Sequence, residues 1–153
     1  MFVVGVLMAF VQGFLIRKAI PFLGAPRTAL VGLIAAVVAY IGIALAPNSA
    51  AVYLWCIVSS LSGLVMPAVQ SMMSNQVPQS EQGELQGAIA SMSSVGAIIG
   101  PIVMTQAFAY FTHSAGSVYF PGAAFLLAGA LSLFALAVFG ANLRKLLGLR
   151  AST

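Results

Sequence analysis

The sequence predicts an all-α membrane protein with five transmembrane helices. Of the 153 residues, 61% are hydrophobic and only 5% are charged. A soluble domain carries about 25% charged residues, which it needs to cover its surface. Two stretches, 28–80 and 85–143, contain no formally charged residue. Each is about twice the roughly 20 residues with which a helix crosses the bilayer, so each is expected to fold back once.

Turn-forming residues near the middle of each stretch divide it into two helices. The first is divided by Pro47-Asn48-Ser49 and the second by the polar segment 112–117. Together with the apolar N-terminal run, the predicted helices span about 1–16, 28–46, 50–73, 83–111 and 119–142. None of these segments alternates apolar and polar residues as membrane-spanning strands do.

The charged residues are few and gathered in three places. They are Arg17, Lys18 and Arg27; Glu81 and Glu84; and Arg144, Lys145 and Arg150. No cluster is broad enough to follow a phosphate backbone, so the net charge of +4 does not indicate nucleic-acid binding. The single cysteine, Cys56, lies in an apolar run and is expected to pack in the protein interior.

The basic residues predict the orientation of the chain. Cytoplasmic segments of membrane proteins are enriched in Lys and Arg. The loop at 17–27 and the tail at 143–153 each hold three basic residues, whereas the turns near 47–49 and 112–118 hold none. We therefore expect 17–27, the loop at 74–82 and the tail on the cytoplasmic side. The first residue then lies outside, which favours a chain with further helices upstream; the alternative is a true five-helix protein.

No constellation typical of an enzyme is present. His113 lies in a predicted external turn with no acid beside it, and acid/base catalysis needs oriented partners. The sequence shows no metal-ligand spacing and no phosphate-binding glycine loop, so we expect neither a metal nor a cofactor. No Asp, Glu, Lys or Arg is predicted at mid-membrane, where a proton relay would use one. With Ser80 as the expected N-cap, Glu81 and Glu84 fall in the first turn of a helix and favour its dipole.

Two helices contain an internal proline. Pro67 lies in the third predicted helix, and Gly100-Pro101 lies in the fourth. Proline removes a helical hydrogen bond and kinks the chain, and the freed carbonyl in lipid must find a partner in protein or water. These residues are candidates for a moving gate; a static packing kink is the alternative.

Small residues mark one face of the fourth predicted helix. Gly83 and Gly87 are four residues apart, as are Gly96 and Gly100, and serines lie between the two pairs. We expect another helix to pack closely against this face. The glutamines within the spans are expected to face other helices or a solute, because an unpaired amide in hydrocarbon is costly.

Three stretches resemble the C-terminal half of a major facilitator superfamily transporter, in its tetracycline-efflux branch of drug/proton antiporters. The first contains Gln12-Gly13 and Arg17, continues through Gly24 and Arg27, and resembles the family's loop between helices eight and nine. The second pairs the segment 66–70 (MPAVQ) with 83–87 (GELQG), similar to helix ten and the start of helix eleven. The third is the segment 96–101 in helix eleven. Pro26 and the missing acidic residue of the loop depart from the family pattern.

The resemblance implies a specific arrangement and function. The five helices would be helices eight to twelve of the fold, in the inner (plasma) membrane of a bacterium. The chain would export a tetracycline-like drug in exchange for protons, together with a missing N-terminal half that carries the coupling acid. Gln12, Met66 and Gln70 would line one wall of the solute cavity, and Gly13, Arg17, Gly24 and Arg27 would form the loop motif. A non-transporting scaffold or assembly protein is the alternative, and the solute itself is not specified by the sequence.

Overall fold

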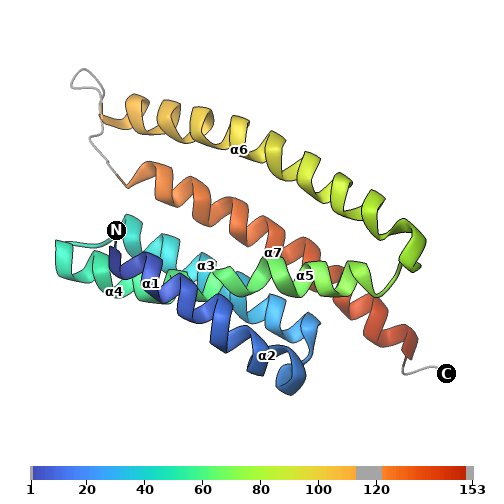
Figure 1. Ribbon diagram of the computed structural model, residues 1–153. Helices are drawn as coiled ribbons and strands as arrows, with labels where there is room; N and C mark the ends of the chain where they lie inside the picture. The colour runs from blue at the N-terminus through green and yellow to red at the C-terminus, as the bar shows by residue number, and fades with distance from the viewer. Residues whose placement is uncertain (1, 113–121, 151–153) are drawn as a thin grey trace.

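The protein is an all-α bundle, as the sequence predicts. The computed structural model describes residues 2–112 and 122–150, and within them every element is helical. The elements in chain order are α1 Phe2–Phe10, the π-helical turn η1 Val11–Leu15, α2 Ile16–Leu23, α3 Ala25–Ala44, α4 Ser49–Ser60, the 3-10 turn η2 Leu61–Leu64, α5 Val65–Ser74, the 3-10 turn η3 Gln79–Glu81, α6 Gln82–Thr112 and α7 Ala123–Arg150. Figure 1 shows how they are arranged.

Four helical segments are long and apolar enough to cross a membrane. These are Ala25–Ala44, the joined pieces Ser49–Ser74, the segment Gln79–Thr112 and the first part of α7, Ala123–Leu143. The N-terminal segment, residues 2–23, is also helical throughout but is interrupted by η1. Large apolar side chains are exposed along these helices, for example Phe134 at 69% and Ile98 at 65%. In lipid rather than water, such exposure is the expected state of a helix surface.

The central helix of the bundle is α3. It packs against α7 on one side and against α4, η2 and α5 on the other. Its buried residues are mostly small, namely Thr28, Ala29, Gly32, Ala35, Ala36, Val37, Ala39 and Ala44. Small residues let helix backbones approach closely, which is how membrane helices gain packing energy where lipid is as apolar as the side chains.

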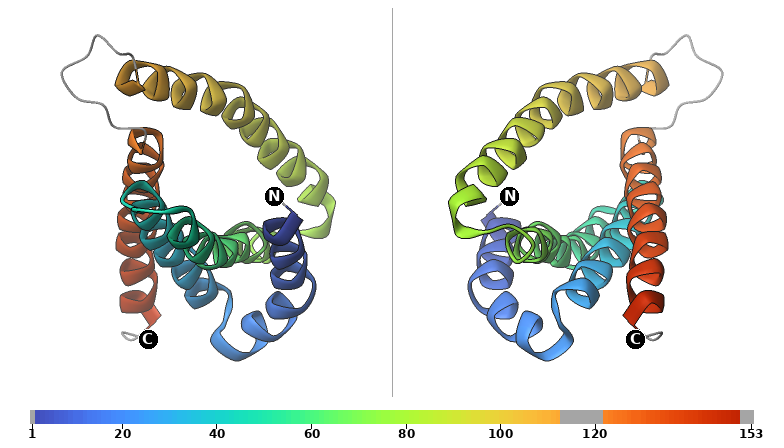
Figure 2. Two further views of the ribbon diagram at one scale, coloured as in Figure 1. Left: turned by 90° about the vertical axis from the view of Figure 1, so that its left-hand side faces the viewer. Right: turned by 90° about the vertical axis from the view of Figure 1, so that its right-hand side faces the viewer.

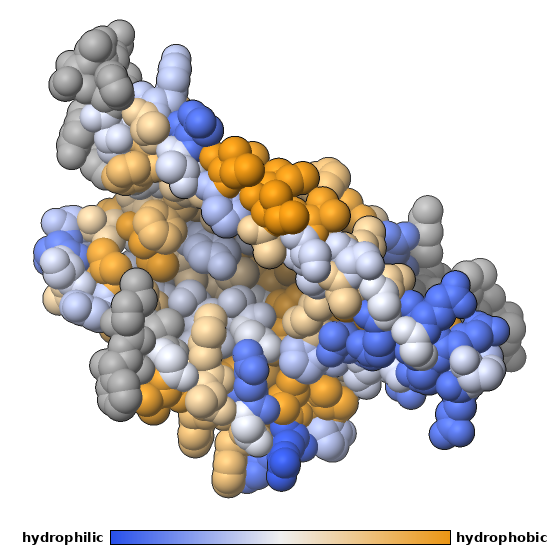
Figure 3. All heavy atoms as spheres, turned by 45° about the horizontal axis from the view of Figure 1, so that its top comes forward, coloured by the Kyte–Doolittle hydropathy of each residue, from blue (hydrophilic) through white to orange (hydrophobic). Residues whose placement is uncertain are grey.

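The α6 helix stands apart from the rest of the bundle. Figure 2 shows it bowing away from the other helices, and it packs mainly against α7. None of its residues is buried, and a β-carbon added at Gly83, Gly87, Gly96 or Gly100 would meet nothing within 4 Å. The close helix packing expected at this small-residue face is therefore absent among the described residues. Figure 3 shows the surface hollowed alongside this helix.

The segment expected to be a loop at 17–27 is almost entirely helical. The N-terminal helix continues through Arg17 to Leu23, and α3 begins at Ala25, so only Gly24 is non-helical. Gly24 has φ 81°, a conformation that other residues rarely adopt, and this one residue reverses the chain. The two charged residues of α2, Arg17 and Lys18, are both exposed.

Two predicted boundaries in the second half of the chain also differ from the structure. The predicted tail at 143–153 is helical as far as Arg150, since Leu, Lys and Arg favour helices and basic residues near a C-terminus favour the dipole. Ser80 lies inside η3, and the residue before that turn is Pro78, so the prediction that Ser80 is the N-cap is wrong. The turn predicted around His113 lies outside the described residues.

Side-chain hydrogen bonds stabilise two of the connections between helices. At the α3–α4 turn, Oδ1 of Asn48 accepts a hydrogen bond of 2.9 Å from the backbone N–H of Ala51 and caps α4. Between α5 and α6, the Ser74 hydroxyl donates to Oε1 of Gln82 at 2.7 Å, and the Gln82 amide donates to the Ser74 carbonyl at 2.8 Å. This pair closes the 74–82 connection. The α2–α3 turn, this connection and the end of α7 lie at one end of the bundle (Figures 1 and 2).

Candidate functional site

Gln12 and Gly63 meet where two helices depart from regular α geometry. Gln12 lies in the π-helical turn η1 and Gly63 lies in the 3-10 turn η2. The Gln12 amide nitrogen is 3.6 Å from the position that a β-carbon on Gly63 would take. The two turns therefore lie in van der Waals reach of each other. Single π turns within helices are frequent at functional sites.

The other predicted cavity residues follow Gly63 along the same face. Met66, Pro67 and Gln70 lie three, four and seven residues after it, the spacing that places residues on one side of a helix. Met66 is 45% exposed and Gln70 is half-buried, while Gln12 is exposed. Gln12 thus lies beside Gly63, and Met66 and Gln70 follow three and seven residues later along the chain. Their role in binding a solute stays a prediction.

This irregular stretch lies halfway along a membrane-crossing segment. The pieces α4, η2 and α5 together run from Ser49 to Ser74, and η2 falls in the middle. Val11, 4% exposed, and Leu64, 3% exposed, fill the interior beside the Gln12–Gly63 contact. The exposed amide of Gln12 therefore emerges from an apolar packing layer.

A serine cluster adjusts the backbone before Pro67. The hydroxyls of Ser59, Ser60 and Ser62 each donate to the carbonyl three residues earlier, at 2.8, 2.7 and 2.7 Å. Such bonds supply extra partners to helix carbonyls and favour local bending. Sequence reasoning did not single out these serines, although the run Ser-Ser-Leu-Ser-Gly at 59–63, directly before a proline, was the signal available.

The two predicted kink positions behave differently. Pro67 is the third residue of α5, directly after η2, and it has no N–H to donate to the Gly63 carbonyl. The change from α to 3-10 geometry occurs within that turn. Pro101, by contrast, lies inside an unbroken α6, and a β-carbon added at Gly100 beside it would meet nothing within 4 Å. The structure does not bring Gly100 and Pro101 to the Gln12 contact.

The residues of the predicted loop motif are spread from η1 to the first turn of α3. Gly13 lies in η1, Arg17 is exposed on α2, Gly24 makes the turn and Arg27 is exposed in the first turn of α3. Sequence reasoning missed the residue that holds the turn. Thr28 is 1% exposed, and its hydroxyl reaches the Gly24 carbonyl at 2.9 Å and the Ala19 carbonyl at 3.2 Å.

Charge is confined to the ends of the helices. Arg17 and Lys18 lie at the start of α2 and Arg27 in the first turn of α3, whereas Glu81 ends η3 and Glu84 lies in the first turn of α6. The segment from Thr28 to Ser80, which includes Gly63, contains no charged residue. Among the described residues, no group of three or more potential metal ligands occurs.

Comparison with known proteins identifies the family. The family model described as Major Facilitator Superfamily matches residues 1–147. The chain belongs to this superfamily. The elements from α1 to α7 are therefore helices of a transporter fold, and the membrane character predicted from composition is confirmed.

Three curated proteins with similar sequences are tetracycline resistance proteins. The chain is 33% identical over 107 residues to the class C tetracycline resistance protein of Escherichia coli and 33% identical over 112 residues to the class G protein of Vibrio anguillarum. These alignments cover 70% and 73% of this chain but 27% of each relative. A class E protein of Escherichia coli is 31% identical over 101 residues. The chain thus matches about a quarter of the length of these relatives. No solved structure matches it.

Proposed function

We propose that this chain is part of a proton-coupled transporter that exports a small, tetracycline-like drug. The observation that carries the proposal is the match to the Major Facilitator Superfamily over residues 1–147, together with three relatives named as tetracycline resistance proteins. A transporter rather than an enzyme also suits a chain whose membrane-spanning segments hold neutral amides and no acid/base pair.

The Gln12 contact is the proposed solute-binding wall. Transporters of this kind bind solute near the bilayer midplane, where helices are interrupted. The η1 and η2 turns interrupt two neighbouring helices, and η2 lies midway along its span. The amides of Gln12 and Gln70 offer both donors and acceptors to an oxygen-rich solute, and Met66 offers an adaptable apolar surface.

The remaining parts of the transport machinery lie elsewhere in the proposed transporter. Solute cavities form at the interface of two structural repeats, and this chain supplies helices of one wall. The chain's only acids, Glu81 and Glu84, are both exposed at the start of α6. The acid that takes up the proton is therefore proposed to come from an N-terminal half, against which this segment packs.

The proposed setting is the inner (plasma) membrane of a bacterium, with the C-terminus in the cytoplasm. The α2–α3 turn with its three basic residues and the end of α7 with three more lie at one end of the bundle (Figure 2). Excess Lys and Arg mark the cytoplasmic side. Under this orientation, the 74–82 connection is cytoplasmic as well.

Motion in the transporter is proposed to centre on the irregular turns. Pro67 with η2 forms a hinge in one helix, and Gly100-Pro101 forms a second bending point in α6. The loop motif Gly13, Arg17, Gly24 and Arg27 joins η1 to α3, so a change at the Gln12 contact reaches the cytoplasmic end through α2. Hinges of this kind are a few residues at the ends of elements.

Drug uptake into inverted membrane vesicles tests the proposal. The complete transporter that carries this segment is compared with its Gln12→Ala and Gln70→Ala variants, and Gln106→Ala on the exposed surface of α6 serves as the matched control. Loss of one hydrogen bond to the solute is expected to weaken apparent affinity roughly fivefold to tenfold. Gln106→Ala should transport as the parent does. Normal uptake by both cavity variants would overturn the binding wall, and absence of any drug-stimulated proton flux in the folded parent would overturn the transport function.

A further inference from the structure

The α2 helix lies across the end of the bundle rather than along it. Figure 2 shows it running crosswise between α1 and α3. Ile16, Ala19 and Ile20 are partly buried and form its inner side, and the outer side is exposed. A short helix with one apolar and one basic face, lying across the end of a membrane bundle, has the geometry of an interfacial helix.

The outer side of α2 combines positive charge with an uncovered aromatic ring. Arg17 and Lys18 are exposed at its start, and Phe22 is 90% exposed near its end. A ring this open, on a chain otherwise rich in lipid-facing residues, indicates an apolar environment at the level of the headgroups. Arg27 adds a third exposed charge in the first turn of α3.

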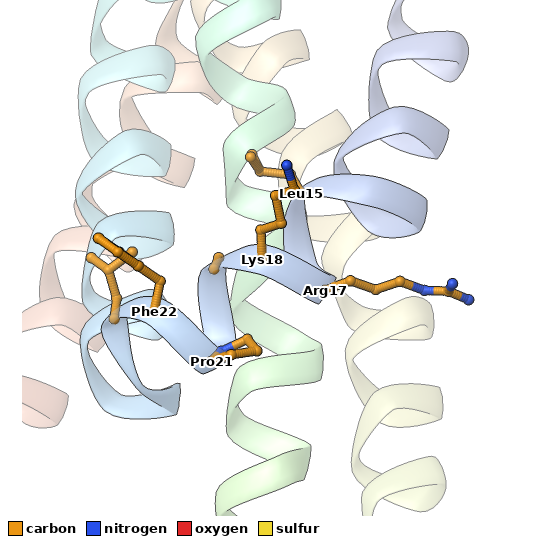
Figure 4. A pocket seen from close by; sticks show the side chains of 7 residues that line it. Leu15, Arg17, Lys18, Pro21 and Phe22 are labelled. Carbon is orange, nitrogen blue, oxygen red and sulfur yellow. The ribbon is translucent and has the colours of Figure 1, made fainter.

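A cavity of about 550 Å³ lies against this helix. Its lining includes Leu15, Lys18 and Phe22. Arg17 also belongs to the lining. Figure 4 shows Lys18 beside Leu15, with Phe22 farther along the helix and Arg17 extending in another direction. The cavity thus has an apolar floor with an ammonium group at its rim. This pairing of groups matches a molecule with an acyl chain next to a phosphate.

We propose that the α2 turn binds an anionic phospholipid of the cytoplasmic leaflet. The lipid phosphate pairs with Lys18, the first carbons of an acyl chain lie on Leu15 and Phe22, and Arg17 adds positive potential from the opposite flank. Each basic residue near an anionic membrane surface adds to the attraction. The inference does not rest on the identity of the transported solute.

Two features of the chain favour a lipid over another protein segment as the occupant. No acidic residue lies on α1, α2, α3, α4 or α5, and the two acids of the chain, Glu81 and Glu84, follow the 74–82 connection. The turn is also held in place, because the buried Thr28 hydroxyl bonds to the carbonyls of Ala19 and Gly24. Because the turn is already held in its conformation, binding a lipid phosphate there does not require the backbone to become ordered.

Native mass spectrometry of the chain in detergent measures the binding directly. The protein is titrated with phosphatidylglycerol, which is anionic, and in parallel with zwitterionic phosphatidylcholine. The double variant Arg17→Gln/Lys18→Gln is expected to bind phosphatidylglycerol on the order of twentyfold more weakly. Its matched control, Arg144→Gln/Lys145→Gln, removes the same charge from the end of α7 and should lose far less. Equal losses in both double variants would overturn the α2 site.

Further variants and a competition experiment distinguish a bound lipid from other bound molecules. Phe22→Ser should weaken phosphatidylglycerol binding, whereas Phe134→Ser, at a residue 69% exposed on α7, should leave it unchanged. Inorganic phosphate in excess should not displace the bound lipid. Displacement by phosphate, equal affinity for the two lipids, or self-association of the chain that depends on Phe22 would each overturn the proposal.

Discussion

The indole of Trp55 occupies the space that a side chain at Gly42 would fill. A β-carbon added to Gly42 would lie 2.7 Å from Cε3 of Trp55 and closer still to Cδ2 and Cε2. The contact joins α4 to the end of α3, beside the turn capped by Asn48. A cavity of about 400 Å³ lies next to it, lined by residues that include Val38, Ile41 and Leu45.

Gly42→Ala is expected to destabilise the bundle by about 1–3 kcal/mol, because the rigid indole must move to admit a methyl group. Trp55 is the only tryptophan in the chain, so its fluorescence reports the change at this site. Thermal unfolding in detergent gives the stability. The control is Gly96→Ala, where an added β-carbon meets nothing within 4 Å. An unchanged melting temperature for Gly42→Ala alongside an unchanged emission spectrum would contradict the contact.

Gly32→Ala is expected to lower stability at a second close approach, between α3 and α5. Its β-carbon would lie 2.7 Å from Cγ2 of Val65 and 3.3 Å from both the Leu61 carbonyl oxygen and the Val65 backbone nitrogen. A double-mutant cycle with Val65→Ala checks the cause. Removing the valine methyl should recover part of the loss, since the closest clash is with that side chain. Strictly additive effects would show that the clash is with the backbone instead.

Composition was sufficient to predict the helical class and most of the spans. Charge-free runs about twice the length of a crossing, with Pro47-Asn48-Ser49 between helices, leave few other arrangements. The turn at Gly24 was harder to predict. The charged residues between 17 and 27 suggested a loop over that whole range, whereas the break between the helices is the single residue Gly24, with φ 81°. The amphipathic period of α2 was the overlooked signal.

The candidate site was predictable only in part. Gln12, Met66 and Gln70 were selected individually, but the approach of the Gln12 side chain to Gly63 joins two positions that are far apart in the sequence. Local propensity does not encode such a contact. The α6 face shows the converse: its spacing of small residues predicts close packing, yet a β-carbon added at Gly83, Gly87, Gly96 or Gly100 would meet nothing within 4 Å.

Thr28→Val is expected to cost about 1–3 kcal/mol of stability. Valine keeps the shape of the buried side chain but removes the hydroxyl that bonds to the Gly24 and Ala19 carbonyls. Thr112→Val is the matched control, because its hydroxyl donates to the Phe108 carbonyl at an exposed position. Guanidinium or thermal unfolding followed by circular dichroism compares the two. A larger effect at Thr112 than at Thr28 would argue against a locked α2–α3 turn.

Pro67→Ala is expected to straighten the α4–α5 segment. Alanine restores an N–H that can donate to the Gly63 carbonyl, so η2 should relax toward regular α geometry. Spin labels at the exposed positions Tyr53 and Met73, in a Cys56→Ser background, report the separation of the two ends. The distance should increase in Pro67→Ala, and Pro101→Ala, on α6, should leave it unchanged. An identical distance distribution in all three proteins would remove the case for a proline hinge here.

Residues 1–153 alone are expected not to transport a tetracycline. Coupled export needs an ionisable group that takes up a proton within the membrane, and the chain's acids, Glu81 and Glu84, are exposed at the end of the bundle. The proposed solute wall of Gln12, Met66 and Gln70 would be one side of a cavity, and alternating access requires two repeats that rock against each other. Proteoliposomes containing the purified chain, given an imposed pH gradient and tetracycline, should show no proton release above that of empty liposomes. The full-length class C tetracycline resistance protein of Escherichia coli is assayed in parallel. The part of it that aligns with this chain is 27% of its length. Proton flux that tetracycline stimulates in the isolated chain, and that Gln12→Ala abolishes, would mean that these helices form a complete pathway, most simply as an oligomer in which a second copy faces the first.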